Sequence, residues 1–147
     1  MKTADQNVKY VEWRSTEEMH AKTVRWISEL EFVKTEQHFL EELIEENTLN
    51  ILSVNTFSQS KELITHLSKT EMKVNALFLQ VQRHNNKLDM LVKTEEAKQV
   101  KDNVKEMHYE LEAAVTSFLS DFKELKTDVF NLIKSIIKIN KQRRLLQ

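Results

Sequence analysis

Residues 19–44 read MHAKTVRWISELEFVKTEQHFLEELI, and this stretch holds the pattern that decides the fold. Mostly apolar residues recur in it at alternating steps of three and four: Met19, Thr23, Trp26, Leu30, Val33, Gln37, Leu40 and Ile44. A mean spacing of about 3.5 residues is that of the buried seam in a left-handed helical bundle. The stretch therefore predicts one long helix that packs against other helices.

Two later stretches repeat this spacing. The second seam comprises Leu67, Thr70, Val74, Leu77, Val81, His84, Leu88 and Leu91. The third comprises Val104, Met107, Leu111, Val115, Phe118, Phe122, Leu125, Val129, Leu132 and Ile136, with one extra step of four residues between 111 and 115. Flanking apolar residues widen the seams to core faces: Ile27, Leu43, Phe78, Leu119 and Ile133. The pattern predicts an all-α protein.

The 147-residue sequence contains no glycine, proline or cysteine. Glycine and proline supply most tight turns and helix stops. Phosphate-binding loops and nucleophile elbows need glycine, whereas disulfides, cysteine zinc sites and thiol catalysis need cysteine. The composition therefore predicts long helices and a non-enzymatic protein, with no catalytic residue, no cofactor and no evident small-molecule substrate.

Three capping patterns locate the expected helix starts. Ser15 and Thr56 are each followed three residues later by Glu or Gln, and Thr94 precedes two glutamates. The expected helices cover about 16–50, 57–91 and 95–145.

A connection over residues 91–95 is too short for anything but an antiparallel turn. The expected fold is therefore an up-down-up bundle of three long antiparallel helices with coiled-coil-like packing. Residues 15–147 are expected to form this single domain, and residues 1–14 a partly ordered N-terminal extension.

The junction between the first two helices combines asparagines with apolar residues. Asparagine replaces glycine as a helix stop because it tolerates left-handed backbone, and it occurs at positions 47, 50 and 55. We expect the apolar residues of the junction to cover the C-terminal part of the third helix. The junction residues are Leu49, Ile51, Leu52 and Val54, and those to be covered are Val129, Leu132, Ile133, Ile136 and Ile137.

Three histidines lie on or beside the seams. With the helices aligned end to end, His20, His84 and His108 fall at a similar height near one end of the bundle. Three imidazoles with Glu17 would hold Zn²⁺ and leave an open position, so a metal-binding bundle is the alternative function. A di-iron site is excluded because no second Glu-x-x-His motif is present. In the competing interpretation, these histidines are partly exposed polar residues near one end of the bundle and bind no metal.

Charge is balanced overall but not along the chain. The net charge is −1, yet after Asp128 the chain carries five lysines and arginines and no acid. The first helix ends with Glu41, Glu42, Glu45 and Glu46. Charge matching within the molecule explains this pattern, and nucleic-acid binding is not expected. No stretch approaches 18 apolar residues, so we expect no membrane span and a cytoplasmic location.

A second stripe runs along the first helix, offset from its main seam: Phe32, Glu36, Phe39 and Leu43. A three-helix core does not need this stripe. It would either bury against residues 1–14 or form a dimer contact that completes a larger bundle. Because a leftover apolar stripe often marks a partner surface, the predicted function is an interaction or scaffold module that binds a protein partner or itself.

Residues 17–43, EEMHAKTVRWISELEFVKTEQHFLEEL, resemble short, uncharacterised all-helical proteins of flavobacteria and their relatives. The shared element is Trp-x-x-Glu-Leu-x-Phe, which stands here at residues 26–32. The resemblance covers the first helix best and implies an all-helical fold, with no activity and no site residues.

Overall fold

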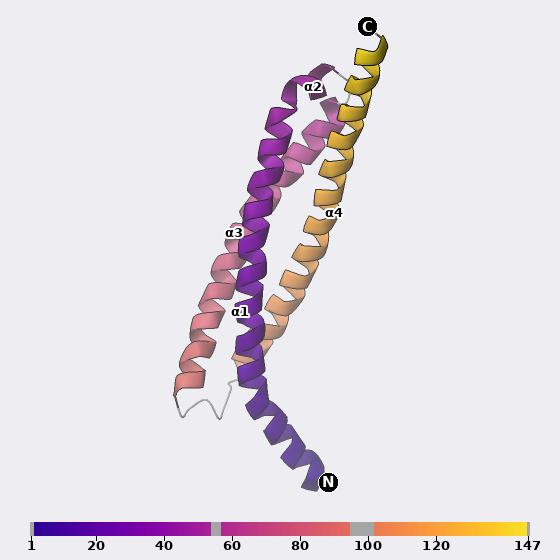
Figure 1. Cartoon of the computed structure of the whole chain (residues 1–147). Helices are drawn as coiled ribbons and strands as arrows, with labels where there is room; N and C mark the ends of the chain where they lie inside the picture. Colours follow the sequence, from indigo (N-terminus) through magenta and orange to yellow (C-terminus); the bar gives the residue numbers. More distant parts are fainter. Residues whose placement is uncertain (1, 54–56, 95–101, 147) are drawn as a thin grey trace. The chain divides into compact units, whose positions relative to one another are not determined.

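The computed structural model describes residues 2–53, 57–94 and 102–146. Within these ranges the chain is helical, has no strand, and forms four helices that pack against one another (Figure 1). They are α1 (Lys2–Glu46), α2 (Thr48–Ser53), α3 (Phe57–Lys93) and α4 (Asp102–Leu146). The prediction of an all-α protein is confirmed.

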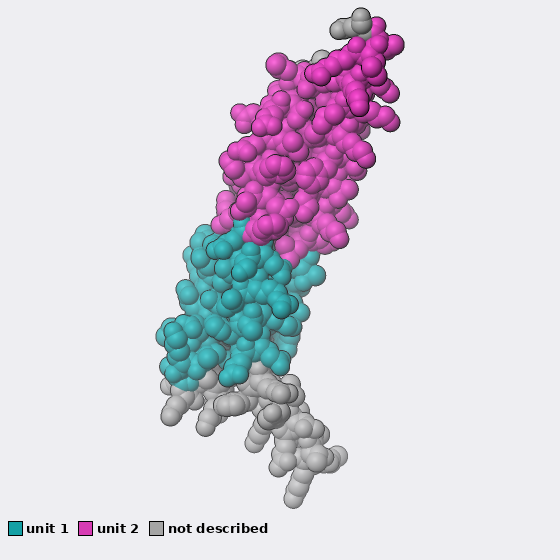
Figure 2. All heavy atoms as spheres, in the orientation of Figure 1, with its two compact units in different colours: residues 1–31, 76–116 teal, residues 32–75, 117–147 magenta. Residues whose placement is uncertain are grey.

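The helices are shared between two compact units (Figure 2). Unit 1 comprises Met1–Glu31 and Ala76–Thr116, and unit 2 comprises Phe32–Asn75 and Ser117–Gln147. Each of α1, α3 and α4 contributes one segment to each unit, whereas α2 belongs to unit 2. The predicted single domain over residues 15–147, with an extension over residues 1–14, stays a prediction.

The seam predicted for the first helix is confirmed, since all eight of its residues are buried. In α3 seven of the eight predicted residues are buried, and Leu91 is half-buried. The buried apolar side chains of unit 1 include Leu30, Val81 and Val115, and those of unit 2 include Leu40, Leu125 and Ile136. Each unit therefore has its own apolar interior, and removal of this apolar surface from water is its main source of stability.

Two polar residues on the seams donate hydrogen bonds inside the bundle. The Thr23 hydroxyl donates to the Met19 carbonyl oxygen at 2.7 Å, which lies four residues earlier on the same helix. In unit 2, Gln37 Nε2 donates across to the Leu67 carbonyl oxygen of α3 at 2.8 Å. A buried polar group that finds such a partner avoids most of its desolvation cost. These residues can therefore occupy core positions.

The third seam is wrong at its beginning. His108 is 1% exposed, whereas the predicted core residue Met107 is 45% exposed and Val104 is half-buried. With His108 in place of Met107, the steps to Leu111 and Val115 are three and four, so the extra step of four disappears. Burial of the polar residue follows from regular helix geometry, because the helix has one continuous inward stripe.

Two of the predicted helix starts are wrong. Ser15 is not a cap, because α1 is continuous from Lys2 to Glu46. Thr94 is not the cap of the next helix either: its hydroxyl donates to the Met90 carbonyl oxygen at 3.0 Å, and its backbone N–H donates to the same oxygen at 3.1 Å. Thr94 thus completes the C-terminal end of α3, and α4 begins later, at Asp102. Thr56 lies outside the described residues.

The first junction is partly a helix, α2, rather than a loop. Asn47 ends α1, with its side-chain Nδ2 donating to the Leu43 carbonyl oxygen at 2.8 Å. Ile51 is buried, as expected of a covering residue, but Leu49 is 82% exposed. Ile137, expected to lie beneath the junction, is also exposed. Val54 and Asn55 lie outside the described residues.

No helix among the described residues is both long and apolar enough to cross a membrane. The cytoplasmic location stays a prediction.

Candidate functional site

Two buried histidines meet in the interior of unit 1. His84 on α3 and His108 on α4 are 2% and 1% exposed, and Nε2 of His84 lies 3.1 Å from Nδ1 of His108. At this distance one ring nitrogen donates a hydrogen bond to the other, and the tautomer decides which one donates. Each imidazole therefore occupies a core position with the other ring as its polar partner.

Two aromatic rings, one from α1 and one from α4, contact His108 of this pair. Trp26 of α1 stacks on His108, with ring centroids 4.8 Å apart and an interplanar angle of 25°. Tyr109 meets the same imidazole edge-on at 6.1 Å. Stacking against a large indole excludes water from the face of the ring and fixes its orientation. Trp26, His84 and His108 thus form one ordered cluster, the histidine cluster.

The surroundings of the histidine cluster favour uncharged imidazoles. Burial, followed by the charges of His108 and Lys87, lowers the pKa of His84 to about 4. Burial, followed by the charge of Lys22, lowers the pKa of His108 to about 4. Both histidines are therefore neutral at pH 7, and a proton added to either one would be held in an apolar, water-poor interior.

One nitrogen of the cluster has no hydrogen-bond partner. Nδ1 of His84 is buried and unpaired among the described residues, as is Oδ1 of the adjacent Asn85. An unpaired buried polar atom costs about 1–3 kcal/mol.

A surface depression borders the cluster between α3 and α4. It has a volume of about 470 Å³ and is lined by Gln80, Arg83, His84, Lys87, Met107, Glu110, Leu111 and Ala114. Two cations and one carboxylate therefore lie beside a neutral imidazole. Because Lys87 contributes to the lowered pKa of His84, charge in the depression affects the buried pair.

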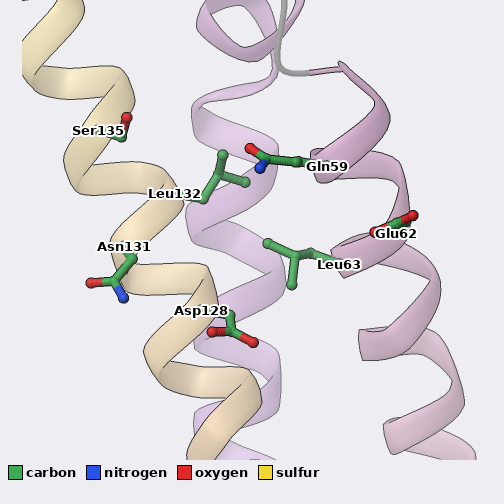
Figure 3. A pocket seen from close by; sticks show the side chains of 7 residues that line it. All are labelled: Gln59, Glu62, Leu63, Asp128, Asn131, Leu132 and Ser135. Carbon is green, nitrogen blue, oxygen red and sulfur yellow. The ribbon is translucent and has the colours of Figure 1, made fainter.

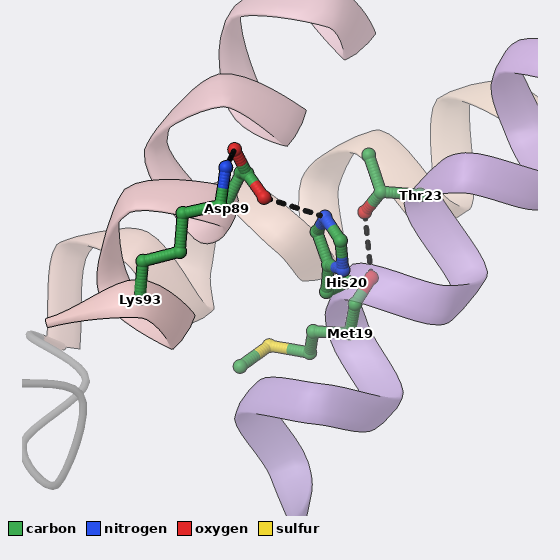
Figure 4. A network of polar contacts seen from close by, with 5 residues as sticks. All are labelled: Met19, His20, Thr23, Asp89 and Lys93. Atoms are coloured by element: carbon green, nitrogen blue, oxygen red, sulfur yellow. Dashed lines mark hydrogen bonds and ion pairs between the residues drawn. The ribbon is translucent and has the colours of Figure 1, made fainter.

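The structure does not assemble the predicted zinc ligands. His20 points instead to Asp89, with Nε2 and Oδ1 3.8 Å apart, and Lys93 Nζ contacts the other carboxylate oxygen at 3.0 Å (Figure 4). Glu17 is exposed. In the described part of the chain, no three His, Cys, Asp or Glu side chains are grouped so as to hold a metal ion. Of the three predicted histidines, only His84 and His108 meet.

A second depression, in unit 2, lies between α3 and α4 and has a volume of about 370 Å³. Figure 3 shows Gln59 and Leu63 extending from α3 toward α4, and Leu132 extending in the opposite direction. Glu62, Asp128, Asn131 and Ser135 complete its lining. Five of its seven lining residues are polar or charged.

The second stripe of α1 lies on a different side of unit 2. Phe32 is 64% and Phe39 53% exposed, so neither ring belongs to the core. Leu43 is half-buried, and Glu36 bonds to Lys126 of α4, with Oε2 and Nζ 2.7 Å apart. The stripe therefore borders the line along which α1 and α4 meet.

A matching apolar set on α4 was not predicted. Phe130 and Ile137 are exposed. Phe130 follows Lys126 by four positions, which places it on the same helix face. Since Lys126 contacts Glu36, the exposed rings of both helices flank one ion pair. We call Phe32, Phe39, Phe130 and Ile137 the aromatic face. A seven-residue step links Phe130 to Ile137 in the sequence, but only the cross-helix contact places them beside α1.

Two of the four glutamates at the end of α1 contact residues of the same helix, and one of them, Glu41, also hydrogen-bonds Glu71 of α3. Glu42 contacts His38 at 3.1 Å, and Glu41 accepts a hydrogen bond from Gln37 at 3.3 Å. Glu36, which does contact Lys126 of α4, lies earlier in the chain than the four glutamates singled out from the sequence.

Comparisons of the chain with protein-family models, curated proteins and solved structures found no match. The resemblance of residues 17–43 to helical proteins of flavobacteria stays a prediction.

Proposed function

We propose that this chain is a non-enzymatic interaction or scaffold module whose binding surface is the aromatic face of unit 2. One observation carries the proposal: Phe32 and Phe39 are more than half exposed, although both are large apolar side chains on a helix with a fully occupied core seam. Single exposed apolar residues are common, but a contiguous set of them marks a surface that binds another molecule.

The proposed architecture is an up-down-up bundle of the three long helices. Two ion pairs support parallel α1 and α4: Lys22 with Glu112 at 3.9 Å in unit 1, and Glu36 with Lys126 at 2.7 Å in unit 2. In both pairs the partners are separated by 90 positions, as expected when two helices run in the same direction. The aromatic face then has parallel helices on its two sides.

Composition supports the face as the working part of the molecule. Without glycine or proline the chain lacks the residues on which catalytic loops usually depend. A binding partner would therefore contact the surfaces of the helices. Helix surfaces bind partners through apolar anchors spaced three, four or seven residues apart. Phe32 and Phe39 have the seven-residue spacing.

The proposal is tested by introducing charge into the aromatic face. We expect the double variant Phe32→Glu with Phe39→Glu to lose binding to its protein partner or to a second copy of itself. A carboxylate at an apolar contact loses its hydration without gaining a partner. The stability of the monomer should change by less than about 0.5 kcal/mol, as for other exposed positions. Solution mass from light scattering and urea unfolding measure the two quantities separately.

A matched control is Met72→Glu on α3, because Met72 is 74% exposed in the same unit but outside the aromatic face. This variant should associate like the original chain. The proposal fails if the double phenylalanine variant keeps both the mass and the binding of the original chain.

A further inference from the structure

The aromatic face lies between two helix segments of opposite charge. Within unit 2, the α1 segment 32–46 carries five carboxylates and one lysine. The α4 segment 117–146 carries three carboxylates and seven lysines or arginines. Their formal charges are therefore −4 and +4. The α3 segment of the same unit, residues 57–75, carries only +1, so the asymmetry belongs to the two helices that border the aromatic face.

A surface with one acidic side and one basic side is complementary to a copy of itself. Two copies that meet through a two-fold axis parallel to the helices place α1 of each copy against α4 of the other. By the 90-position offset of the two ion pairs, the −4 segment then lies twice opposite residues 122–136, which carry three lysines and two carboxylates and so +1. The further basic residues 137–146 begin just beyond the level of Glu46. A two-fold axis across the helices places α1 on α1 and α4 on α4, and this juxtaposition of like charges is unfavourable.

We propose that the occupant of the aromatic face is a second copy of this chain, joined by a two-fold axis parallel to α1 and α4. The inference rests on the proposed function and specifies its partner. Phe39 of one copy lies opposite Phe130 of the other, and the contact completes a four-helix arrangement of α1 and α4 from both copies. The acidic and basic residues at its margins select this orientation.

Solution mass is the first test. The chain should have about twice the 17.5 kDa mass of one copy. The Phe39→Glu variant should have the mass of one copy, whereas the Met72→Glu variant should keep the doubled mass. A chain that is monomeric at every concentration overturns the inference. The proposed function then fails only if Phe32→Glu with Phe39→Glu also leaves the binding of every other tested protein unchanged.

Charge reversal tests the pairing of α1 with α4. One variant carries Glu42→Lys and Glu46→Lys, and a second carries Lys134→Glu and Lys141→Glu; all four residues are exposed. Each variant alone should be monomeric, because like charges then face one another across the interface. An equimolar mixture should recover the doubled mass. Mixing cannot repair a folding defect within one chain, so recovery assigns the effect to the interface, and no recovery overturns the orientation.

Cross-linking distinguishes the two possible axes. The sequence contains no cysteine, so Thr35→Cys on α1 and Thr127→Cys on α4 each introduce one thiol at an exposed position beside the aromatic face. With a short bis-maleimide, a mixture of the two variants should yield far more covalent dimer than either variant alone. Efficient cross-linking of Thr35→Cys by itself would place α1 on α1 and overturn the proposed axis.

Discussion

At the residue scale, the histidine cluster shows how a polar side chain can replace an apolar one in a helical core. His84 and His108 each occupy a seam position, and their mutual hydrogen bond and the stacked Trp26 indole make this possible. The sequence placed His84 on the seam correctly but put Met107 where His108 lies. The spacing of apolar residues cannot identify the buried position when a polar residue is buried and its apolar neighbour is exposed.

The lowered pKa values of these histidines predict that unit 1 loses stability in acid. Below the ordinary histidine pKa of 6.5 the unfolded chain binds protons that the folded chain does not accept until about pH 4. The free energy of unfolding should therefore fall as the pH drops from 6.5 to 4, by about 1.4 kcal/mol per pH unit for each histidine. Urea unfolding at a series of pH values measures this slope.

A double variant, His84→Leu with His108→Leu, should flatten the dependence between pH 6.5 and 4. His66→Leu serves as the control, because His66 is exposed. If the double variant keeps the slope of the original chain, acid sensitivity arises elsewhere.

At the element scale, the helices end where local side chains bond to their last carbonyl groups. Asn47 caps α1, and Thr94 bonds back to α3, although the sequence pattern favoured Thr94 as the start of the next helix. The same Thr-Glu pattern is compatible with either role, because threonine accepts a hydrogen bond from an N–H and donates one to a carbonyl oxygen. Only the position of the neighbouring backbone decides between them.

The rotation of α4 about its own axis can be tested at two adjacent residues. We expect Met107→Lys to change the free energy of unfolding by less than about 0.5 kcal/mol, because the side chain is exposed. His108→Lys should lower it by several kcal/mol or prevent folding, because a buried ammonium has no compensating partner there. Thermal unfolding followed by circular dichroism compares the two. Equal effects would contradict the observed rotation.

At the scale of the whole molecule, the aromatic face combines exposed apolar side chains with an acidic helix segment on one side and a basic helix segment on the other. Unit 1 contains the buried histidine cluster, and unit 2 contains the exposed rings of Phe32, Phe39 and Phe130. The sequence identified the half of this face that α1 supplies. It missed the half on α4, because Phe130 becomes its neighbour only through the Glu36–Lys126 contact.

Opposite charges at the margins of the aromatic face predict that self-association weakens with salt. The Debye length falls from about 10 Å at 0.1 M to about 3 Å at 1 M, which screens the attraction between the acidic and basic segments. The dissociation constant, measured by sedimentation equilibrium, should rise between 50 mM and 500 mM NaCl. Phe39→Glu should remain monomeric throughout. A dissociation constant that falls with salt would indicate a contact dominated by apolar surface alone.

The sequence by itself determined the all-α class and the core seam of α1 over residues 19–44, and it placed most of the other two seams correctly. It could do so because helical periodicity is a local property that each segment carries in its own residue order. Tertiary structure alone decided that His84 bonds His108 while His20 turns to Asp89, and that Phe130 stands beside the α1 stripe. These pairings depend on the relative height and rotation of neighbouring helices. Contacts between residues far apart in the chain set that height and rotation, so no single segment encodes them.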